Sequence, residues 1–204
     1  MPDNHSRSAD ATGPLAIIVT GLPSTGKTRL AVRISERFGL PLACKDDYKE
    51  AFFDTLGWGD RAWSRRLGQA AGAALQLFLA AHARVGGPCI IESNFPPVAA
   101  AELGAIQQAH PFRPLQVVCR TDGEVLLERF AARTGQRHPG HGDEALVEEL
   151  TPVLLAGEYE PLDLGGTMYE IDTTDFAAVD YDALYNAIEQ ELSRGPWFAF
   201  KRSP

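Results

Sequence analysis

The chain has 204 residues and a formal net charge of −8, and 45% of its residues are hydrophobic. This apolar fraction can build the core of one globular domain, and it excludes a chain that is disordered throughout. No apolar run reaches the roughly 20 residues that a membrane-spanning helix needs, and the polar first 14 residues do not resemble a secretory signal. The acidic balance disfavours nucleic acid as a partner, although it leaves a local basic groove open.

Short apolar runs alternate with stretches of helical periodicity after a loose polar tail at residues 1–14. Strands are expected at residues 15–20, 40–44, 89–92, 115–119 and 168–172. Helices are expected at residues 27–38, 60–85, 97–108, 122–134, 143–155 and 177–192. Strands that alternate with helices predict a three-layer α/β fold with a five-stranded parallel sheet. We expect this fold to form a single domain over residues 15–204.

The run GLPSTGKT matches the phosphate-binding pattern GxxxxGK[ST] at every fixed position, between a predicted strand and a predicted helix. Backbone N–H groups of such a loop surround phosphate groups at the positive end of the helix. Lys27 can reach the β- and γ-phosphates, and the Thr28 hydroxyl can ligate Mg²⁺. No NKxD-like guanine-reading motif is present, so we expect ATP. The expected nucleotide-binding residues of the loop are Gly21, Ser24, Thr25, Gly26, Lys27 and Thr28.

Nucleotide binding alone leaves a kinase, a motor and a switch open, and this chain is too short for the coupling elements of the last two, so a compact P-loop kinase fits better. A kinase also needs a carboxylate close to the acceptor hydroxyl, because that hydroxyl loses its proton as the phosphoryl group is transferred. The segment KDDYK begins where the second predicted strand ends. The carboxyl ends of parallel strands share one edge of the sheet, so Asp46 and Asp47 are presented beside the phosphate loop. One of them is a candidate base, and one is a candidate helix N-cap.

These segments resemble, in the same order, a group of P-loop kinases. The group contains the zeta toxins and the polynucleotide 5′-hydroxyl kinases, and chloramphenicol phosphotransferase is similar in layout. The resemblance covers roughly residues 15–140 and is carried by GLPSTGKT, by KDDYK and by ESN after the third strand. It implies a P-loop kinase fold with a helical lid.

The resemblance also implies roles for single residues. Asp46 takes the position of the general base, and Lys49 that of a cation that contacts the substrate. Glu92 and Asn94 are expected to orient the substrate or the magnesium shell. The chain departs from the pattern twice: Lys49 stands where polynucleotide kinases carry arginine, and Glu92 stands where aspartate is usual.

A lid is expected over about residues 122–142. Arg129 and Arg133 are four residues apart and therefore share one face of a helix, and Arg137 follows in a glycine-containing loop. Arginines that close over a transferred phosphoryl group stabilise its developing charge, so we expect Arg129 and Arg133 to bind ATP, with Arg133 as the catalytic candidate. The alternative is a solvated helix surface in which neighbouring glutamates pair with these arginines.

The histidines and cysteines indicate no metal centre. His138 and His141 lie in the loop, and a His-x-x-His pair without further ligands favours substrate contact or lid packing. Cys44, Cys89 and Cys119 are odd in number and widely spaced, and we expect them to be buried, inert thiols. The expected compartment is the cytoplasm.

We expect an ATP- and Mg²⁺-dependent kinase that phosphorylates a hydroxyl of a small molecule. The loop at residues 172–175 is expected to back the adenine, and Trp58, Trp63 and Phe95 are candidate walls of the acceptor pocket. Two alternatives stay open. The first is a polynucleotide or nucleotide 5′-hydroxyl kinase, favoured by a basic patch at the start of the long helix, which is formed by Arg61, Arg65 and Arg66. The second is a nucleotide-dependent binding or regulatory protein.

Overall fold

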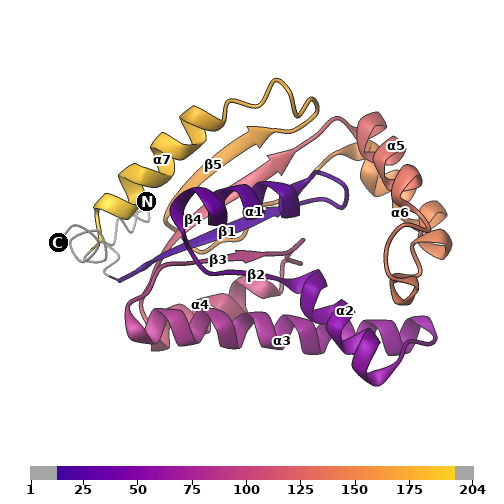
Figure 1. The fold of residues 1–204 in the computed structure, drawn as a ribbon, viewed down its shortest axis with the longest axis horizontal. Coiled ribbons are helices and arrows are strands. Elements are labelled where there is room, and N and C mark those ends of the chain that lie inside the picture. Colours follow the sequence, from indigo (N-terminus) through magenta and orange to yellow (C-terminus); the bar gives the residue numbers. More distant parts are fainter. Residues whose placement is uncertain (1–12, 196–204) are drawn as a thin grey trace, which may run out of the picture.

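The structure, a computed structural model, describes residues 13–195. Its centre is a sheet of five parallel strands in the order β2-β3-β1-β4-β5 (Figure 1), as the sequence predicts. The strands are β1 Leu15–Gly21, β2 Leu42–Cys44, β3 Cys89–Glu92, β4 Arg113–Arg120 and β5 Thr167–Asp172. Every residue of β1 and β3 is buried, which is typical of parallel strands that are covered on both faces.

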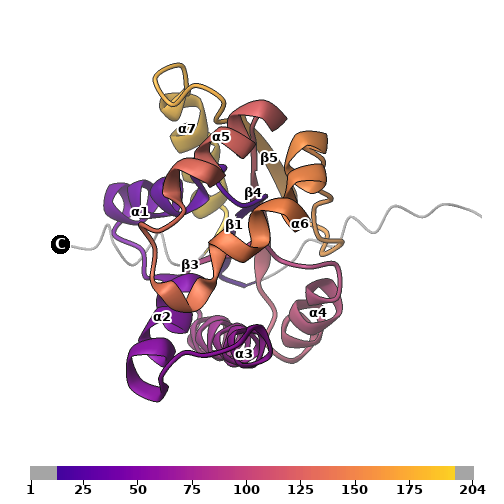
Figure 2. The same ribbon diagram turned by 90° about the vertical axis from the view of Figure 1, so that its right-hand side faces the viewer.

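Helices cover both faces of the sheet and form the outer layers (Figures 1 and 2). They are α1 Lys27–Phe38, α2 Lys45–Leu56, α3 Arg61–Val85, α4 Ala99–Ala109, α5 Gly123–Arg133, α6 Asp143–Ala156 and α7 Tyr181–Ser193. Side chains of α1 and α7 pack on one face against alternate β1 residues, Leu15, Ile17 and Val19. Side chains of α3 and α4 pack on the other face against Ala16 and Ile18. The predicted three-layer α/β architecture is confirmed.

The strand register brings the functional segments together at the carboxyl edge of the sheet. Glu92, the last residue of β3, lies beside Val19 of β1 and Cys44 of β2. Gly21 pairs with Cys119 of β4 at the same edge. Helices α5 and α6, together with the beginning of α3, lie beyond this edge (Figures 1 and 2). The site is therefore framed by the strand ends on one side and by these helices on the other.

The apolar pattern does not predict α2, and it misplaces the start of α7. Helix α2 buries only Phe53, so no stripe of apolar residues at helical spacing marks it in the sequence. Helix α7 begins at Tyr181 instead of residue 177, because the Asp180 side chain accepts a hydrogen bond from the Ala183 N–H and caps the helix there. A short 3₁₀ turn, Pro139–His141, also lies in the segment that was predicted to be a loop.

The cysteine prediction is confirmed: Cys44, Cys89 and Cys119 are free and buried. Burial raises the pKa of Cys89 and of Cys119 to about 12, so these thiols stay protonated. Within residues 13–195 no helix is both long and apolar enough to span a bilayer. Most of the predicted tail, residues 1–12, lies outside the described residues. Pro14 accepts a backbone hydrogen bond from Arg113.

Candidate active site

The phosphate loop joins β1 to α1 through backbone conformations that the sequence is suited to adopt. Gly21 has φ 144°, and a Cβ atom there would lie 2.6 Å from the carbonyl oxygen of Cys119. Gly26 has φ 81° where α1 begins, and a Cβ atom would collide with the ring of Phe176. Ser24 is the only non-glycine residue with positive φ in the described chain, at 68°. The loop therefore needs glycine at both ends and holds Ser24 in a rarely populated conformation.

A cavity of about 260 Å³ lies over this loop. It is lined by Ser24, Gly26, Lys27, Thr28, Arg29, Arg129, Arg133 and Phe176. Two buried side-chain polar atoms of the described residues have no hydrogen-bond partner: Oγ of Ser24 and Nε of Arg133. Both belong to residues that line this cavity. Unsatisfied buried donors are rare in folded proteins, and here both belong to residues beside a space that an oxygen-rich ligand could enter.

Glu92 lies next to the two phosphate-loop side chains that carry the expected chemistry. The Thr28 hydroxyl donates a hydrogen bond to Oε2 of Glu92 at 3.0 Å, and Nζ of Lys27 lies 4.0 Å from Oε1. Burial raises the pKa of Glu92, although the charge of Lys27 and the hydrogen bond from Thr28 partly oppose this rise. The carboxylate is therefore on the nucleotide side of the site.

Asp46 lies in the first turn of α2 and pairs with the lid. Its Oδ2 accepts a hydrogen bond from Nη2 of Arg137 at 2.6 Å. Burial alone would raise the pKa of Asp46, but Arg137, His141 and Lys27, with a further contribution from Lys49, outweigh burial and lower it. This carboxylate is therefore ionised near neutral pH and lies within the electrostatic reach of the phosphate-loop lysine.

Asp47 does not cap α2. The N-cap residue is Cys44, which makes no side-chain capping hydrogen bond, and Asp47 lies inside the first turn with its side chain exposed. The expectation that one of the two aspartates is an N-cap is therefore wrong. The reason is that the helix begins immediately at the end of β2, before either aspartate.

The two predicted lid arginines lie along the same helix but make different contacts. Arg129 donates hydrogen bonds to the carbonyl oxygens of Thr173 and Thr174, at 2.9 and 2.7 Å, and its guanidinium lies 4.2 Å from the ring centroid of Phe176. Arg129 thus ties α5 to the loop that follows β5. Nε of Arg133 lies 3.6 Å from a carboxylate oxygen of Asp143, and Arg133 lines the phosphate-loop cavity.

The loop between α5 and α6 is docked on α2. The His138 ring stacks on Phe53 with 4.9 Å between ring centroids, and Nε2 of His141 lies 2.8 Å from Oε1 of Glu50. A Cβ atom on Gly140 would lie 2.7 Å from the Phe53 ring, so glycine permits this close approach. The Ser64 hydroxyl of α3 donates a hydrogen bond to the Gly140 carbonyl at 2.8 Å. His138 and His141 therefore take part in packing the lid.

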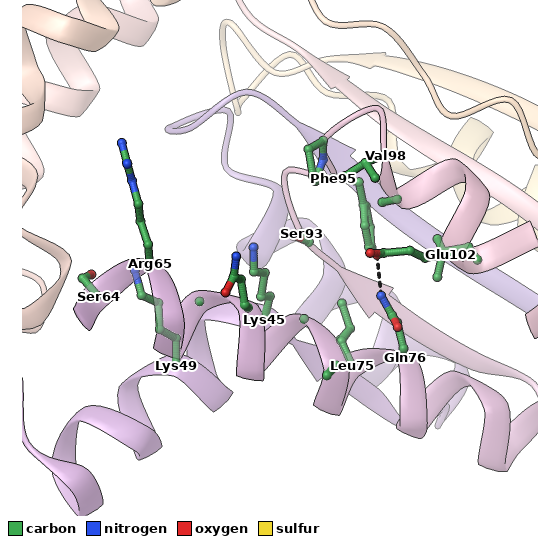
Figure 3. Close-up of a pocket in the computed structure, with 17 residues that line it drawn as sticks. Lys45, Lys49, Ser64, Arg65, Leu75, Gln76, Ser93, Phe95, Val98 and Glu102 are labelled. Carbon is green, nitrogen blue, oxygen red and sulfur yellow. Dashed lines mark hydrogen bonds between the residues drawn. The ribbon is translucent and has the colours of Figure 1, made fainter. Parts of the chain in front are cut away.

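Two further cavities, of about 790 and 900 Å³, lie along α3 beside the strand ends (Figure 3 shows the first). Lys49 lines both, and Asn94 lines the larger one. Phe95 lines the smaller cavity.

The tryptophans do not line either of these cavities within the described residues, so the expectation that Trp58 and Trp63 form walls of the acceptor pocket is corrected. Trp58 packs instead against His138, and Trp63 donates its indole N–H to the Gly57 carbonyl.

One residue of the site, Phe176, and one contact, between Arg137 and Asp46, carried no clear signal in the sequence. Phe176 packs over Gly26 between Arg29 and Arg129, and only its position four residues after β5 could have pointed to it. The contact between Arg137 and Asp46 joins residues that are 91 positions apart. Arg137 was visible as a cation in a glycine-containing loop, but its partner follows from how the lid docks on α2.

A parallel sheet in the order 2-3-1-4-5, a phosphate loop at the end of its central strand and a helical lid over the strand ends define the chain as a kinase-like P-loop domain. The family model described as "AAA domain" (AAA_33) matches residues 17–154, and the chain belongs to this family. The predicted resemblance to the P-loop kinase group is confirmed at this level.

Two solved structures illustrate the similarity. A candidate kinase from Chloroflexus aurantiacus is 38% identical with a TM-score of 0.79, and the match covers 88% of this chain and 98% of that one. A gluconokinase from Sinorhizobium meliloti is 18% identical with a TM-score of 0.52, and the match covers 94% of this chain and 99% of that one. The second match supports the fold alone. No curated protein matches the chain.

Proposed function

We propose that this protein is an ATP- and Mg²⁺-dependent kinase that transfers the γ-phosphate of ATP to a hydroxyl group of a small molecule. The observation that carries the proposal is a pair of buried polar atoms without a hydrogen-bond partner, Oγ of Ser24 and Nε of Arg133, whose residues line one cavity from the phosphate loop and from α5. A bound triphosphate offers acceptor oxygens to both at once.

On the nucleotide side, Lys27 and the amides of the phosphate loop bind the phosphates. Thr28 and Glu92 present a hydroxyl and a carboxylate 3.0 Å apart, a set of oxygen donors that fits Mg²⁺. When bound there, Mg²⁺ would neutralise charge on the β- and γ-phosphates. This contact between Glu92 and Thr28 favours a role for Glu92 in the magnesium shell over a role in substrate binding.

On the transfer side, Asp46 serves as the base that orients the acceptor hydroxyl and accepts its proton. Its lowered pKa keeps it ionised, and the charge of Lys27 contributes to that lowering, which supports a position near the phosphate loop. Arg133 stabilises the charge that develops on that phosphate. Arg129 positions the loop at residues 172–175, which lies where the adenine is expected, through its hydrogen bonds to Thr173 and Thr174.

On the acceptor side, Lys49 and Asn94 contact a molecule bound in the cavity of about 900 Å³, a volume typical of sites for small ligands. The basic patch that favoured a polynucleotide is partly engaged within the protein. Arg61 pairs with Glu149 at 2.5 Å, and the Arg66 guanidinium lies 5.7 Å from the centroid of the Trp63 ring. These contacts leave less of the patch for a phosphate backbone, so we favour a small acceptor.

The test is an acceptor screen. The protein is incubated with Mg²⁺-ATP and panels of hydroxylated metabolites and antibiotics, and mass spectrometry looks for a gain of one phosphate. Lys27→Ala serves as the control for contaminating kinases. A product that wild type makes and Lys27→Ala does not make supports the kinase. Strong stabilisation by Mg²⁺-ATP without a product from any acceptor favours the nucleotide-dependent binding protein instead.

A further inference from the structure

The two cavities along α3 meet at a wall that is basic although the protein as a whole is acidic. Five residues line both of them, namely Lys45, Lys49, Ser64, Arg65 and Pro96. Three of the five are cations and none is a carboxylate. The protein has a formal net charge of −8, so its overall composition does not explain why positive charge is concentrated at this junction.

These cations are not neutralised by ion pairs. Within residues 13–195, Lys45, Lys49 and Arg65 take part in none of the salt bridges, in contrast to Arg61 and Arg137. The acidic residues next to Lys45 and Lys49 in the sequence have other partners: Arg137 binds the Asp46 carboxylate at 2.6 Å, and Nε2 of His141 lies 2.8 Å from Oε1 of Glu50. Burial lowers the pKa of Lys49, the charges of Asp46 and Asp143 oppose this effect, and the charges of Lys45 and Arg137 add to it. The junction therefore gathers three cations that form no salt bridge within the described residues, with Asp46 and Asp143 acting on Lys49 only through their charge.

The acidic residues in the cavity walls lie away from the junction and are engaged elsewhere. Glu149 in the larger cavity pairs with Arg61, and Glu102 in the smaller cavity accepts a hydrogen bond from Gln76 at 2.6 Å (Figure 3). Asp60 accepts a hydrogen bond from the Trp63 N–H and caps α3. Each of these carboxylates thus has a donor of its own, and each lies in only one of the two cavities.

The cations of the junction come from α2 and α3. The Lys49 side chain of α2 lies against α3 beside Gly68, where a Cβ atom would be in ordinary van der Waals contact with Cε of Lys49 at 3.7 Å. Lys45 and Arg65 project from α2 and α3 into the same open space (Figure 3). Because the cations come from two helices and line the same space, an anionic group that enters it is attracted from both sides.

We propose that the acceptor is a small anionic molecule whose phosphate or carboxylate group binds at this junction, between Lys45, Lys49 and Arg65. The assignment rests on the proposed kinase function and narrows its substrate class. Lys45 and Arg65 are binding residues for the acceptor, and the anionic group fixes the orientation in which a hydroxyl of the same molecule reaches Asp46. Charge-assisted hydrogen bonds of this kind are strong enough for one lost partner to reduce affinity about tenfold or more.

The first experiment measures anion binding without catalysis. The phosphate loop is saturated with Mg²⁺ and a non-hydrolysable ATP analogue, and inorganic phosphate or malonate is then titrated at constant ionic strength set by chloride. Wild type should gain further thermal stabilisation from the anion. In the double variant Lys45→Ala/Arg65→Ala, the anion concentration that gives half of this stabilisation should rise about tenfold or more. Arg66→Ala is the matched control, because Arg66 is the next residue on α3 and lines neither cavity. Absence of a shift in wild type, or an equal shift in the double variant, overturns the proposal.

The second experiment uses acceptors in matched pairs that differ in charge. Glycerate and glycerol, pantothenate and panthenol, and a nucleoside 3′-monophosphate and its nucleoside are incubated with Mg²⁺-ATP. Phosphorylation should be confined to anionic members, and Arg65→Ala should raise KM for the acceptor about tenfold while leaving the KM for ATP unchanged. The pairs also show whether phosphate or carboxylate is preferred. Equal turnover of a neutral partner overturns the proposal.

The two experiments separate the failure of this inference from the failure of the proposed kinase function. Anion binding that depends on Lys45 and Arg65, with no product from any acceptor, supports the anion site and counts against the kinase. Product formation that is unchanged when Lys45 and Arg65 are replaced supports the kinase function and overturns the proposal of an anion site. A labelled oligonucleotide with a free 5′-hydroxyl is included, and its preferential phosphorylation would show that the junction binds a nucleic acid instead of a small anion.

Discussion

The nucleotide side and the acceptor side of the site hold their charged groups differently. Lys27 has a side chain only 11% exposed, lies 4.0 Å from Glu92 and contacts the Leu22 carbonyl at 3.4 Å. Arg65 on the acceptor side is exposed, and no salt bridge within the described chain includes it. The nucleotide side is built from adjacent strand ends and one short loop, whereas the acceptor side is assembled from α2, α3 and the lid.

The difference between the two sides indicates which parts of the site are fixed before a ligand binds. Strand register places Glu92 beside Val19, and the phosphate loop follows β1 without a break, so the geometry at Thr28 and Glu92 depends on the core of the sheet. The larger acceptor cavity is lined by residues 139–142, so it depends on the docking of this loop on Phe53 of α2. We therefore expect variants on the nucleotide side to change ATP binding, and variants on the acceptor side to change transfer or lid docking.

The largest effect is expected from Asp46→Asn. The amide keeps the size of the side chain but cannot accept the proton of the acceptor hydroxyl, so kcat should fall by about 10²–10⁴-fold. The affinity for Mg²⁺-ATP should be retained, and both quantities can be measured by steady-state kinetics and thermal shift. Asp47→Asn is the control, because Asp47 is exposed in the same helical turn and should change kcat little. Equal losses in the two variants would move the base away from Asp46.

The next largest effect is expected from Lys27→Ala. Loss of a charge-assisted contact to phosphate typically costs about 1.5–3 kcal/mol, so the affinity for Mg²⁺-ATP should fall about 10- to 100-fold. Thermal stabilisation of the protein by Mg²⁺-ATP should shrink accordingly. Lys45→Ala, a cation on the acceptor side, should leave this stabilisation at the wild-type level. Equal stabilisation of wild type and Lys27→Ala would contradict the phosphate-loop assignment.

The nucleotide side of the site can be predicted from the sequence more completely than the acceptor side. The phosphate loop and the five strands follow from local patterns, and the edge at which Glu92 and Asp46 meet follows from the parallel sheet. Glu92 could be placed at that edge, but its contact with Thr28 depends on a register that the sequence does not reveal.

The acceptor side depends on interactions that have no local signature. The helix α2 buries only Phe53, and that side chain packs against Gly140, which is 87 positions later in the chain (140 minus 53). The N-cap expectation for the aspartates was wrong, since α2 begins at Lys45 directly after β2. Trp58 and Trp63 were expected to form walls of the acceptor pocket, whereas small residues of α3, such as Gly68 and Gly72, line the smaller of the two cavities.

A smaller effect is expected from Gly140→Ala, which tests lid docking alone. The added methyl group would approach the Phe53 ring within 2.7 Å, and overpacking of this kind costs about 1–3 kcal/mol. The free energy of unfolding should fall by this amount in urea titrations, while Mg²⁺-ATP still stabilises the protein. Gly104→Ala is the matched control, because its Cβ atom would meet open space within α4, and alanine there should be neutral or stabilising by about 0.5–1 kcal/mol. Equal destabilisation by both substitutions would contradict the close packing of the lid on α2.

The smallest expected effect is a change in pH dependence caused by Arg137→Gln. The positive charges around Asp46, with Arg137 the strongest, outweigh burial and lower the pKa of this carboxyl below its ordinary value of 3.8. Removal of Arg137 leaves burial less opposed, so the pKa should rise, and the acid limb of the profile of kcat/KM against pH should move to higher pH. The stability of the fold follows the same ionisation. Ionised Asp46 stabilises the wild-type protein at pH values above its pKa in the unfolded chain, and this contribution is lost as the pH falls through its lower pKa in the folded protein. The variant should therefore be less sensitive to acid between these two pH values. Arg66→Gln, a matched loss of charge on α3, should leave the acid limb in place, and an unshifted limb in Arg137→Gln would show that Asp46 is not the group whose ionisation limits transfer.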